Sequence, residues 1–201
     1  MNETVTMTAV IGTIVIFALI IAVTSIFGRR FTELPERRAG RLGERFATTI
    51  ISEILSSGDI LLTNVPISFG GMQSELDNVV INENGVSIIE VKNYAGELFG
   101  GEDDPEWIMN GSGADMLNQH PVENPIEQVK RQMEILSRIL NFNGIRASVK
   151  GYVFFVNMNS PVDSGYILGT RDDIDAAVHA VREERMEPGA AERIAKLLAR
   201  K

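Results

Sequence analysis

Residues 82–85, Asn-Glu-Asn-Gly, lie between two apolar runs and restrict the fold more than any other short stretch of this chain. Asn-Gly suits the positive φ angles of a tight two-residue turn, and the Val- and Ile-rich runs on both sides are typical of strands. The sequence therefore predicts an antiparallel hairpin over residues 76–92, with its turn centred on residues 83 and 84. This register decides which side chains of the two strands are neighbours.

Two charged residues interrupt the apolar second strand of the predicted hairpin, Val86–Lys92. Residues two apart on a strand point to the same side, so Glu90 and Lys92 share one face with Val86 and Ile88. Two interpretations follow. Either the strand lies at a sheet edge with a wet face, or the two charged groups are placed for chemistry.

The predicted turn places Asp77 of the first strand opposite Glu90, with Cβ atoms about 4.5–5.5 Å apart. Two carboxylates so close repel each other, and a divalent cation between them removes that repulsion. Carboxylate oxygens suit Mg²⁺ or Mn²⁺, and Mg²⁺ commonly binds one or two of them while keeping several waters. Lys92, on the same face, could orient a metal-bound water or help to deprotonate it.

Helical periodicity covers residues 35–56, where apolar residues recur every four positions. Glu44 falls at the edge of the apolar arc of this predicted helix, which is unusual for a carboxylate, although a partly solvated side chain is a common explanation. The stripe expected to face the core consists of Leu42, Phe46, Ile50 and Ile54, widened by Ala47, Ile51 and Leu55.

The rest of the pattern alternates strands and helices. We predict strands over 60–67 and 149–156, a loop over 68–74, and a polar loop over 93–124 with a short strand at Trp107 and Ile108. Proline suits the first turn of a helix, so a helix begins at Pro125, and further helices begin at Asp172 and Pro188. The buried face of the helix at Pro125 is expected to comprise Ile126, Val129, Met133, Leu136 and Leu140. The order α-β-β-β-α-β followed by two helices predicts an α/β sandwich.

Residues 7–27 contain 21 consecutive uncharged residues. As a helix this run would span roughly 31 Å, which matches the hydrocarbon thickness of a bilayer. A cleaved signal peptide is disfavoured, because the N-terminus has no Lys or Arg and the run is too long. Five arginines follow within residues 29–41, so the positive-inside bias places the N-terminus outside and residues 28–201 in the cytoplasm of a single-pass protein.

Composition excludes several kinds of site. The chain has no cysteine and two histidines, so thiolate metal sites, cysteine nucleophiles and multi-histidine zinc sites are excluded. The histidines, His120 and His179, are interpreted as surface residues. Residues 51–201 hold 13 basic and 23 acidic residues, a net charge of −10 that argues against a broad, sequence-blind nucleic-acid binder.

Asp77, followed after twelve residues by Glu90-Val91-Lys92, resembles the PD-(D/E)xK motif of restriction-endonuclease-like proteins. Further landmarks of the same region, residues 38–157, make the chain similar to the nuclease-related domain (NERD) family. These landmarks are Gly43-Glu44, Glu75–Val80, Ile89–Tyr94 with Gly96, Trp107, and Asn124-Pro125 with Gln128. The chain has Glu75-Leu76-Asp77-Asn78 where the family often has Gln-Ile-Asp-His, which puts a substrate contact in doubt.

The resemblance implies a restriction-endonuclease-like core and a metal-dependent phosphodiesterase that acts on nucleic acid, expected to be DNA. It also implies roles for individual residues. Catalytic roles are expected for Glu44, Asp77, Glu90, Lys92 and Gln128, and metal ligation for Asp77, Glu90 and Val91.

Four segments follow from these interpretations. They are a membrane anchor at 1–28, which contacts the lipid bilayer through residues 7–27, a basic linker at 29–37, the NERD-like domain at 38–157 and a helical extension at 158–201.

Two other functions remain open from the residues. A catalytically inactive module of the same fold could bind nucleic acid or a protein partner at the membrane, and the acidic charge favours this. A purely structural interpretation makes Glu90 and Lys92 a salt bridge on a wet sheet face, where such pairs contribute about 0–1 kcal/mol.

Overall fold

The computed structural model describes residues 35–111, 118–182 and 185–199. The chain divides into two units, residues 1–39 and 40–201, and the fold below is that of the second. The predicted membrane anchor at residues 7–27 lies outside the described residues. Within the described ranges, no helix is both long enough and apolar enough to cross a bilayer.

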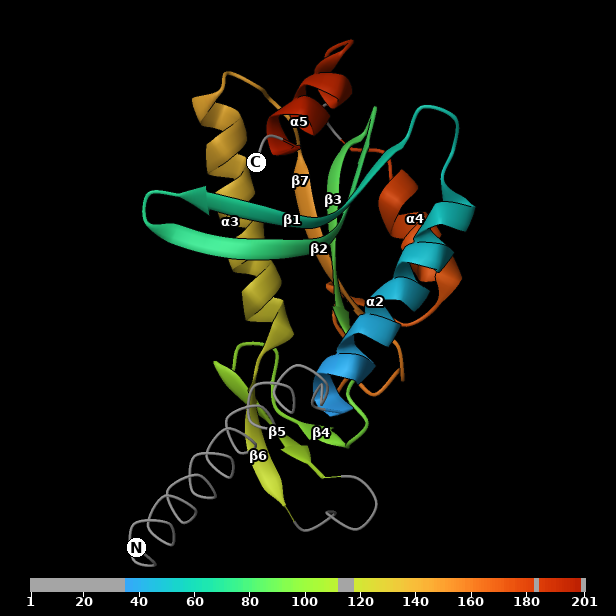
Figure 1. Cartoon of the computed structure of the whole chain (residues 1–201), viewed down its shortest axis with the longest axis vertical. Helices are drawn as coiled ribbons and strands as arrows, with labels where there is room; N and C mark the ends of the chain where they lie inside the picture. Colours follow the sequence, from blue (N-terminus) through green and yellow to red (C-terminus); the bar gives the residue numbers. More distant parts are fainter. Residues whose placement is uncertain (1–34, 112–117, 183–184, 200–201) are drawn as a thin grey trace, which may run out of the picture. The chain divides into compact units, whose positions relative to one another are not determined.

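A five-stranded mixed sheet, in the order β1-β2-β3-β7-β8, forms the centre of this unit (Figure 1). Neighbours among β1, β2 and β3 are antiparallel, whereas β7 is parallel to β3 and β8 is parallel to β7. The strands are β1 (Ile60–Phe69), β2 (Met72–Asn82), β3 (Gly85–Lys92), β7 (Val149–Phe155) and β8 (Ile167–Leu168).

Helices cover both faces of this sheet, as two hydrophobic clusters show. One cluster joins α3 (Pro125–Phe142) and α5 (Ala190–Leu198) to side chains such as Val86 and Ile88 of β3. The other joins α2 (Pro35–Ile54) and α4 (Arg171–His179) to Ile89 and Val91 of the same strand. The predicted mixed α/β fold is confirmed, and its core elements occur in the predicted order α2, β1, β2, β3, α3, β7.

The hairpin of β2 and β3 has the predicted register, with Asn78 opposite Ile89 and Asn82 opposite Gly85. However, β3 lies between β2 and β7 and is not an edge strand. Glu90 retains only 3% of its accessible surface. The wet-face interpretation of Glu90 and Lys92 is therefore wrong.

Strand pairing is interrupted at Asp77. The β1–β2 pairs pass from Thr63–Asn78 to Val65–Leu76, and between them Asn64 has a φ of 52°. The β2–β3 pairs end at Asn78–Ile89, so the predicted pair of Asp77 with Glu90 is not part of the ladder. Asp77 therefore lies where β2 leaves β3, and its position within β2, not at the start of the strand, corrects the predicted strand boundary.

The predicted loop over 68–74 is also wrong, because β1 and β2 continue through it to a turn at Gly70 and Gly71. Both glycines have positive φ angles, 58° and 87°, which glycine adopts without steric cost. The sequence predicted no strand over residues 68–74 because this stretch contains few apolar residues.

A separate three-stranded sheet lies within the predicted polar loop over 93–124. Only its central strand was indicated by the sequence, through Trp107 and Ile108. Trp107 is fully buried and stacks on Phe155 at 6.1 Å between ring centroids. The strands are β4 (Leu98–Phe99), β5 (Glu106–Asn110) and β6 (Gln119–Glu123).

Only part of the predicted apolar stripe of α2 packs on the sheet. Leu42 and Phe46 are 55% and 51% exposed, whereas Ala47 and Ile51 are fully buried. Gly43 explains this difference, because a Cβ on Gly43 would lie 2.8 Å from the Cβ of Asn93. The small residue Gly43 therefore allows α2 to come close to the sheet, with Ala47 and Ile51 in the contact.

The helix α3 begins at Pro125 as predicted, and the Asn124 side chain caps it by accepting a 2.9 Å hydrogen bond from the amide of Ile126. Its buried face includes Gln132, while the predicted Met133 is only partly buried. Gly151 of β7 allows the close packing of this helix. A Cβ there would lie 2.6 Å from Cγ2 of Val129.

Candidate functional site at the end of β3

Glu90, Lys92 and Gln128 form a closed hydrogen-bonded triangle between β3 and α3. Lys92 Nζ donates to Oε1 of Glu90 at 2.8 Å and to Oε1 of Gln128 at 2.9 Å. Gln128 Nε2 donates to the same oxygen of Glu90 at 2.6 Å. The structure therefore brings together these three predicted site residues, although Gln128 comes from a helix 36 residues further along the chain than Lys92.

Gln132 is a fourth member of this arrangement and was not predicted. Its Nε2 donates to Oε2 of Glu90 at 2.8 Å and to the backbone oxygen of Glu75 at 3.0 Å. The side chain is fully buried. Its position three residues after Val129 and four before Leu136 was the available signal, because a polar residue there lies on the apolar face of the helix.

Asp77 is held beside β3 by the backbone of Val91, whose amide donates to Oδ2 of Asp77 at 2.8 Å. Burial raises the pKa of Asp77 to about 7, and the nearby charge of Glu90 adds to this effect. The Val91 amide and the Lys92 ammonium oppose the shift without cancelling it. Asp77 and Glu90 are therefore close enough for the electrostatic conflict that the sequence predicted.

Lys92 remains an ammonium in this environment. Burial acts to lower its pKa, but the Glu90 carboxylate, the neighbouring Tyr94 and Asp77 act in the opposite direction, and the pKa is raised above its ordinary value. A group that holds its proton this firmly is a poor base at neutral pH. A retained positive charge suits charge stabilisation better than the predicted deprotonation of water.

Glu44 approaches the site from α2. It is partly exposed, and its charge is the smallest of the influences that raise the pKa of Asp77. One turn further along α2, Thr48 Oγ1 donates to Oδ1 of the fully buried Asn78 at 2.7 Å. This bond ties α2 to the residue next to Asp77.

The fit of a divalent cation can be tested from the oxygen atoms. Oε1 of Glu90 already accepts two hydrogen bonds, whereas Oε2 of Glu90 and Oδ2 of Asp77 each accept one. An oxygen of a carboxylate can accept two partners, so both residues retain capacity. Val91 can contribute only its backbone carbonyl oxygen, because its side chain has no donor atom.

In the described parts of the chain, no group of three or more acidic or histidine residues is arranged to hold a metal. Two carboxylates suffice for Mg²⁺ or Mn²⁺, which keep several waters, but not for an all-protein calcium cage. The residues therefore fit a hydrated, open Mg²⁺-type site.

Comparison with known proteins gives the family. The model for the nuclease-related domain matches residues 39–156, more than half of the chain. The chain belongs to the NERD family. An uncharacterized protein of Bacillus anthracis is 25% identical over 125 residues, which cover 62% of this chain and 57% of that protein. The match therefore spans little more than half the relative's length. No solved structure matches.

All of the site residues lie inside the NERD match, including the unpredicted Gln132. Residues just beyond it support the NERD loop that follows Lys92. Asn157 Nδ2 donates to the backbone oxygen of Tyr94 at 2.7 Å, and Asn159 Nδ2 donates to that of Gly96 at 2.7 Å. The segment after the match thus contributes to the geometry of the NERD domain.

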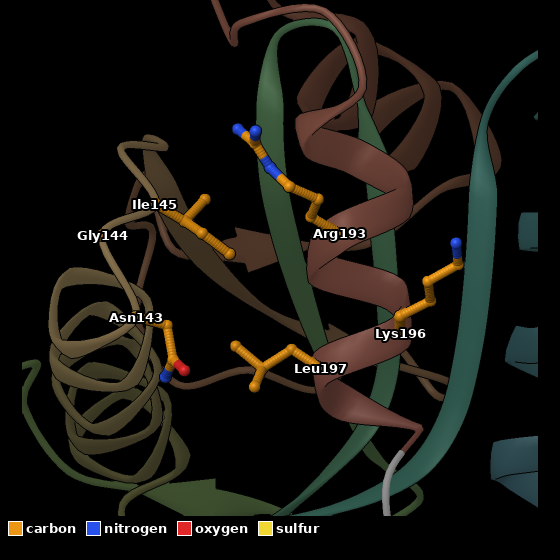
Figure 2. Close-up of a pocket in the computed structure, with 6 residues that line it drawn as sticks. All are labelled: Asn143, Gly144, Ile145, Arg193, Lys196 and Leu197. Atoms are coloured by element: carbon orange, nitrogen blue, oxygen red, sulfur yellow. The ribbon is translucent and has the colours of Figure 1, made fainter.

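A pocket of about 340 Å³ lies between the end of α3 and α5 (Figure 2). It contains none of the NERD site residues. Arg193 and Lys196 of α5 line one side, and both are exposed. Arg193 also pairs with Glu187 at 3.3 Å. The pocket is lined by Asn143, Gly144, Ile145, Arg193, Lys196 and Leu197.

Proposed function

We propose that this NERD protein is a membrane-anchored, divalent-metal-dependent nuclease that hydrolyses phosphodiester bonds of DNA on a restriction-endonuclease-like core. The observation that carries the proposal is the convergence of Asp77, Glu90 and Lys92 where β2 leaves β3. A buried ion pair alone would not require a second carboxylate beside it. The raised pKa of Asp77 means that this carboxylate costs stability when it is charged without a cation.

Four residues of the site have distinct parts in this proposal. Asp77 and Glu90 would hold Mg²⁺ or Mn²⁺, which when bound polarises the phosphate and stabilises charge on the leaving oxygen. Attack of water on phosphorus would form one P–O bond and break the ester P–O bond, while the water gives up one proton to solvent and the leaving oxygen takes one up from solvent. The Lys92 ammonium supplies positive charge to the phosphate during this change, and Gln128 fixes its position.

Residues 7–27 are proposed as the single membrane span, with the N-terminus outside and the NERD domain in the cytoplasm. The 21-residue uncharged run and the arginines that follow it support this arrangement. Resistance of the full chain to extraction from membranes by alkaline carbonate tests the anchor. Recovery of the protein in the soluble fraction would refute it.

A catalytically inactive module that binds nucleic acid or a partner protein is the second candidate. The hydrogen bonds of Glu90 favour it, because both oxygens already accept protein donors. The net charge of −10 on residues 51–201 also disfavours a broad DNA-binding surface.

One experiment separates the two candidates. The full chain in detergent micelles is incubated with plasmid and single-stranded DNA, with Mg²⁺, with Mn²⁺ and with a chelator. We expect cleavage only with a cation, and its loss in Asp77→Asn and Lys92→Gln. The matched controls are Asp163→Asn and Lys150→Gln, which replace exposed residues of the same types and should retain activity.

Cation binding by calorimetry without cleavage would identify the inactive module. Cleavage that persists in both Asp77→Asn and Lys92→Gln would refute the proposed site, because it would come from other residues or from a contaminant.

A further inference from the structure

We propose that the outer face of α2, made of Arg41, Leu42, Arg45 and Phe46, binds the surface of an anionic lipid bilayer. The inference rests on the membrane anchor of the proposed function, since that anchor brings α2 to the membrane. It adds a second, electrostatic contact that would fix how the NERD domain lies against the bilayer.

Leu42 and Phe46 are large apolar side chains that lie exposed to solvent on the surface of α2. They lie four residues apart on α2, and 55% and 51% of their accessible surface is exposed. Residues at this spacing are neighbours on a helix. Together they form a small apolar ridge, while Ala47 and Ile51 on the opposite side of the helix are fully buried.

Two exposed arginines flank this ridge. Arg41 and Arg45 are also four residues apart and exposed. At about 100° per residue, they lie beside the apolar pair on the same outward half of the helix. A basic row next to an apolar row is typical of helices that lie in the membrane interface, where long cationic side chains reach the phosphates.

The distribution of charge indicates which surface this face fits. Residues 28–50 carry six Arg and three Glu, whereas residues 51–201 carry a net charge of −10. Anionic lipid therefore repels most of the folded domain and attracts the segment that contains α2. Only thirteen residues separate Phe27, the end of the uncharged run, from Arg41, so this face lies near the proposed membrane span along the chain.

Lipid explains the apolar residues better than nucleic acid does. Phosphates of DNA would pair with Arg41 and Arg45 but offer no partner to Leu42 and Phe46. In a bilayer, such side chains enter the boundary between headgroups and acyl chains. The combination therefore favours an anionic lipid surface as the occupant.

The test uses the absence of cysteine from the chain. Thr49→Cys places a single nitroxide label on the exposed side of α2 without changing the four residues of the outer face. The full-length protein is reconstituted in vesicles of phosphatidylcholine, with and without phosphatidylglycerol. Collision of the label with a water-soluble nickel complex is then measured, and a label at Asn141→Cys on α3 serves as the control.

We expect a severalfold fall in collision rate at position 49 when phosphatidylglycerol is present, and no fall at position 141. In the Arg41→Gln/Arg45→Gln background the fall should disappear. Equal accessibility in neutral and anionic vesicles would overturn the proposal. Protection of position 49 in detergent by duplex DNA, or by raised protein concentration, would assign the face to nucleic acid or to a second copy instead.

Failure of the anchor gives a different result. Without the anchor, the full-length protein would not float with neutral vesicles, whatever happens at α2. In that case, flotation with anionic vesicles that requires Arg41 and Arg45 supports the outer face of α2, and its absence overturns it.

Discussion

The backbone amide of Val91 donates a 2.8 Å hydrogen bond to Oδ2 of Asp77, at the point where β2 and β3 stop pairing. A side-chain oxygen thus replaces the backbone acceptor that a continued ladder would supply. Because Val91 lies between Glu90 and Lys92, the bond fixes the Asp77 carboxylate beside both charged groups. Asp77 is thus a structural hydrogen-bond acceptor as well as a proposed cation ligand.

Asp77→Asn should stabilise the cation-free protein above pH 7. The pKa of Asp77 is about 7 in the folded chain against 3.8 for an ordinary aspartate, so the folded state keeps a proton that the unfolded state loses between these values. Stability therefore falls as pH rises through this window. At about 1.4 kcal/mol per pKa unit, the charged carboxylate costs on the order of 2–4 kcal/mol, and asparagine removes that cost.

Urea unfolding at pH 4, pH 6 and pH 8 in the presence of a chelator measures this effect. The asparagine oxygen can still accept the Val91 amide, so the hydrogen bond is retained. Asp163→Asn, an exposed control, should leave the pH dependence unchanged. If the stability of Asp77→Asn depended on pH as that of the parent does, the raised pKa of Asp77 would be contradicted.

Cation binding should release a proton below pH 7 and almost none at pH 8.5. A divalent cation requires Asp77 in its charged form, and near pH 6 this residue is mostly protonated in the cation-free protein. Calorimetric titration with Mn²⁺ at pH 6, in two buffers of different ionisation enthalpy, measures up to about one released proton per site. Heats that do not depend on the buffer would show that Asp77 is not a ligand. Asp77→Asn should abolish the release.

Gln132→Met should destabilise the protein by about 1–3 kcal/mol, because it leaves the buried Oε2 of Glu90 and the backbone oxygen of Glu75 without their donor. If the cation binds at Glu90, its affinity should fall roughly 10–100-fold through loss of the group that orients the ligand. Denaturant unfolding and Mn²⁺ titration measure the two effects. Gln119→Met, at an exposed position of β6, is the matched control. Unchanged stability would mean that Gln132 does not orient Glu90.

His179 should add stability at acidic pH that is lost as pH rises. Its hydrogen bond to Asp59 raises its pKa, burial opposes the shift, and Asp175 adds to it. Both contacts, 3.0 Å to Asp59 and 2.7 Å to Asp175, gain strength when the ring is charged. The contribution is therefore complete below about pH 6.5 and disappears above the raised pKa of the folded state.

His179→Gln should remove this difference, which we expect to be roughly 0.5–1 kcal/mol for a partly exposed ion pair. Unfolding of parent and variant at pH 6 and pH 9 measures it. His120→Gln, at an exposed position of β6, is the control. A parent protein that loses no more stability than the variant between these pH values would refute the assignment.

Short-range rules were sufficient to predict the centre of the site. The Asn-Gly turn fixes the register of β2 and β3, and the two-residue period of a strand separates Glu90 from Ile89. These rules act between neighbours in sequence. They therefore placed Glu90 and Lys92 on one face of β3 with Asp77 nearby, but they did not show that β2 leaves β3 before the predicted Asp77–Glu90 pair. Nor did they show that β3 is an interior strand, which depends on its pairing with the distant β7.

Features set by contacts between distant segments were not predictable in the same way. The helical period gives the apolar arc of α2, including Ala47 and Ile51, but the exposure of Leu42 and Phe46 follows from the close approach of Gly43 to Asn93. Gln132 is a polar residue on the apolar face of α3. Its burial is explained by the hydrogen bond to Glu90 of β3, which is distant in sequence. The sheet of β4, β5 and β6 is built on Trp107, whose burial depends on Phe155.

Gly151 carries no functional group, yet it governs the dimensions of the site. Gly151 belongs to β7, lies opposite Ile88 of β3, and allows α3 to pack directly against β7. The amides of Gln128 and Gln132 that donate to Glu90 belong to that helix, so their distance from Glu90 depends on a residue that is not one of the predicted site residues. A related chain could keep every acidic, basic and amide residue of the motif and still lose the geometry through one added methyl group. Searches for active relatives by motif alone would count such a chain as intact.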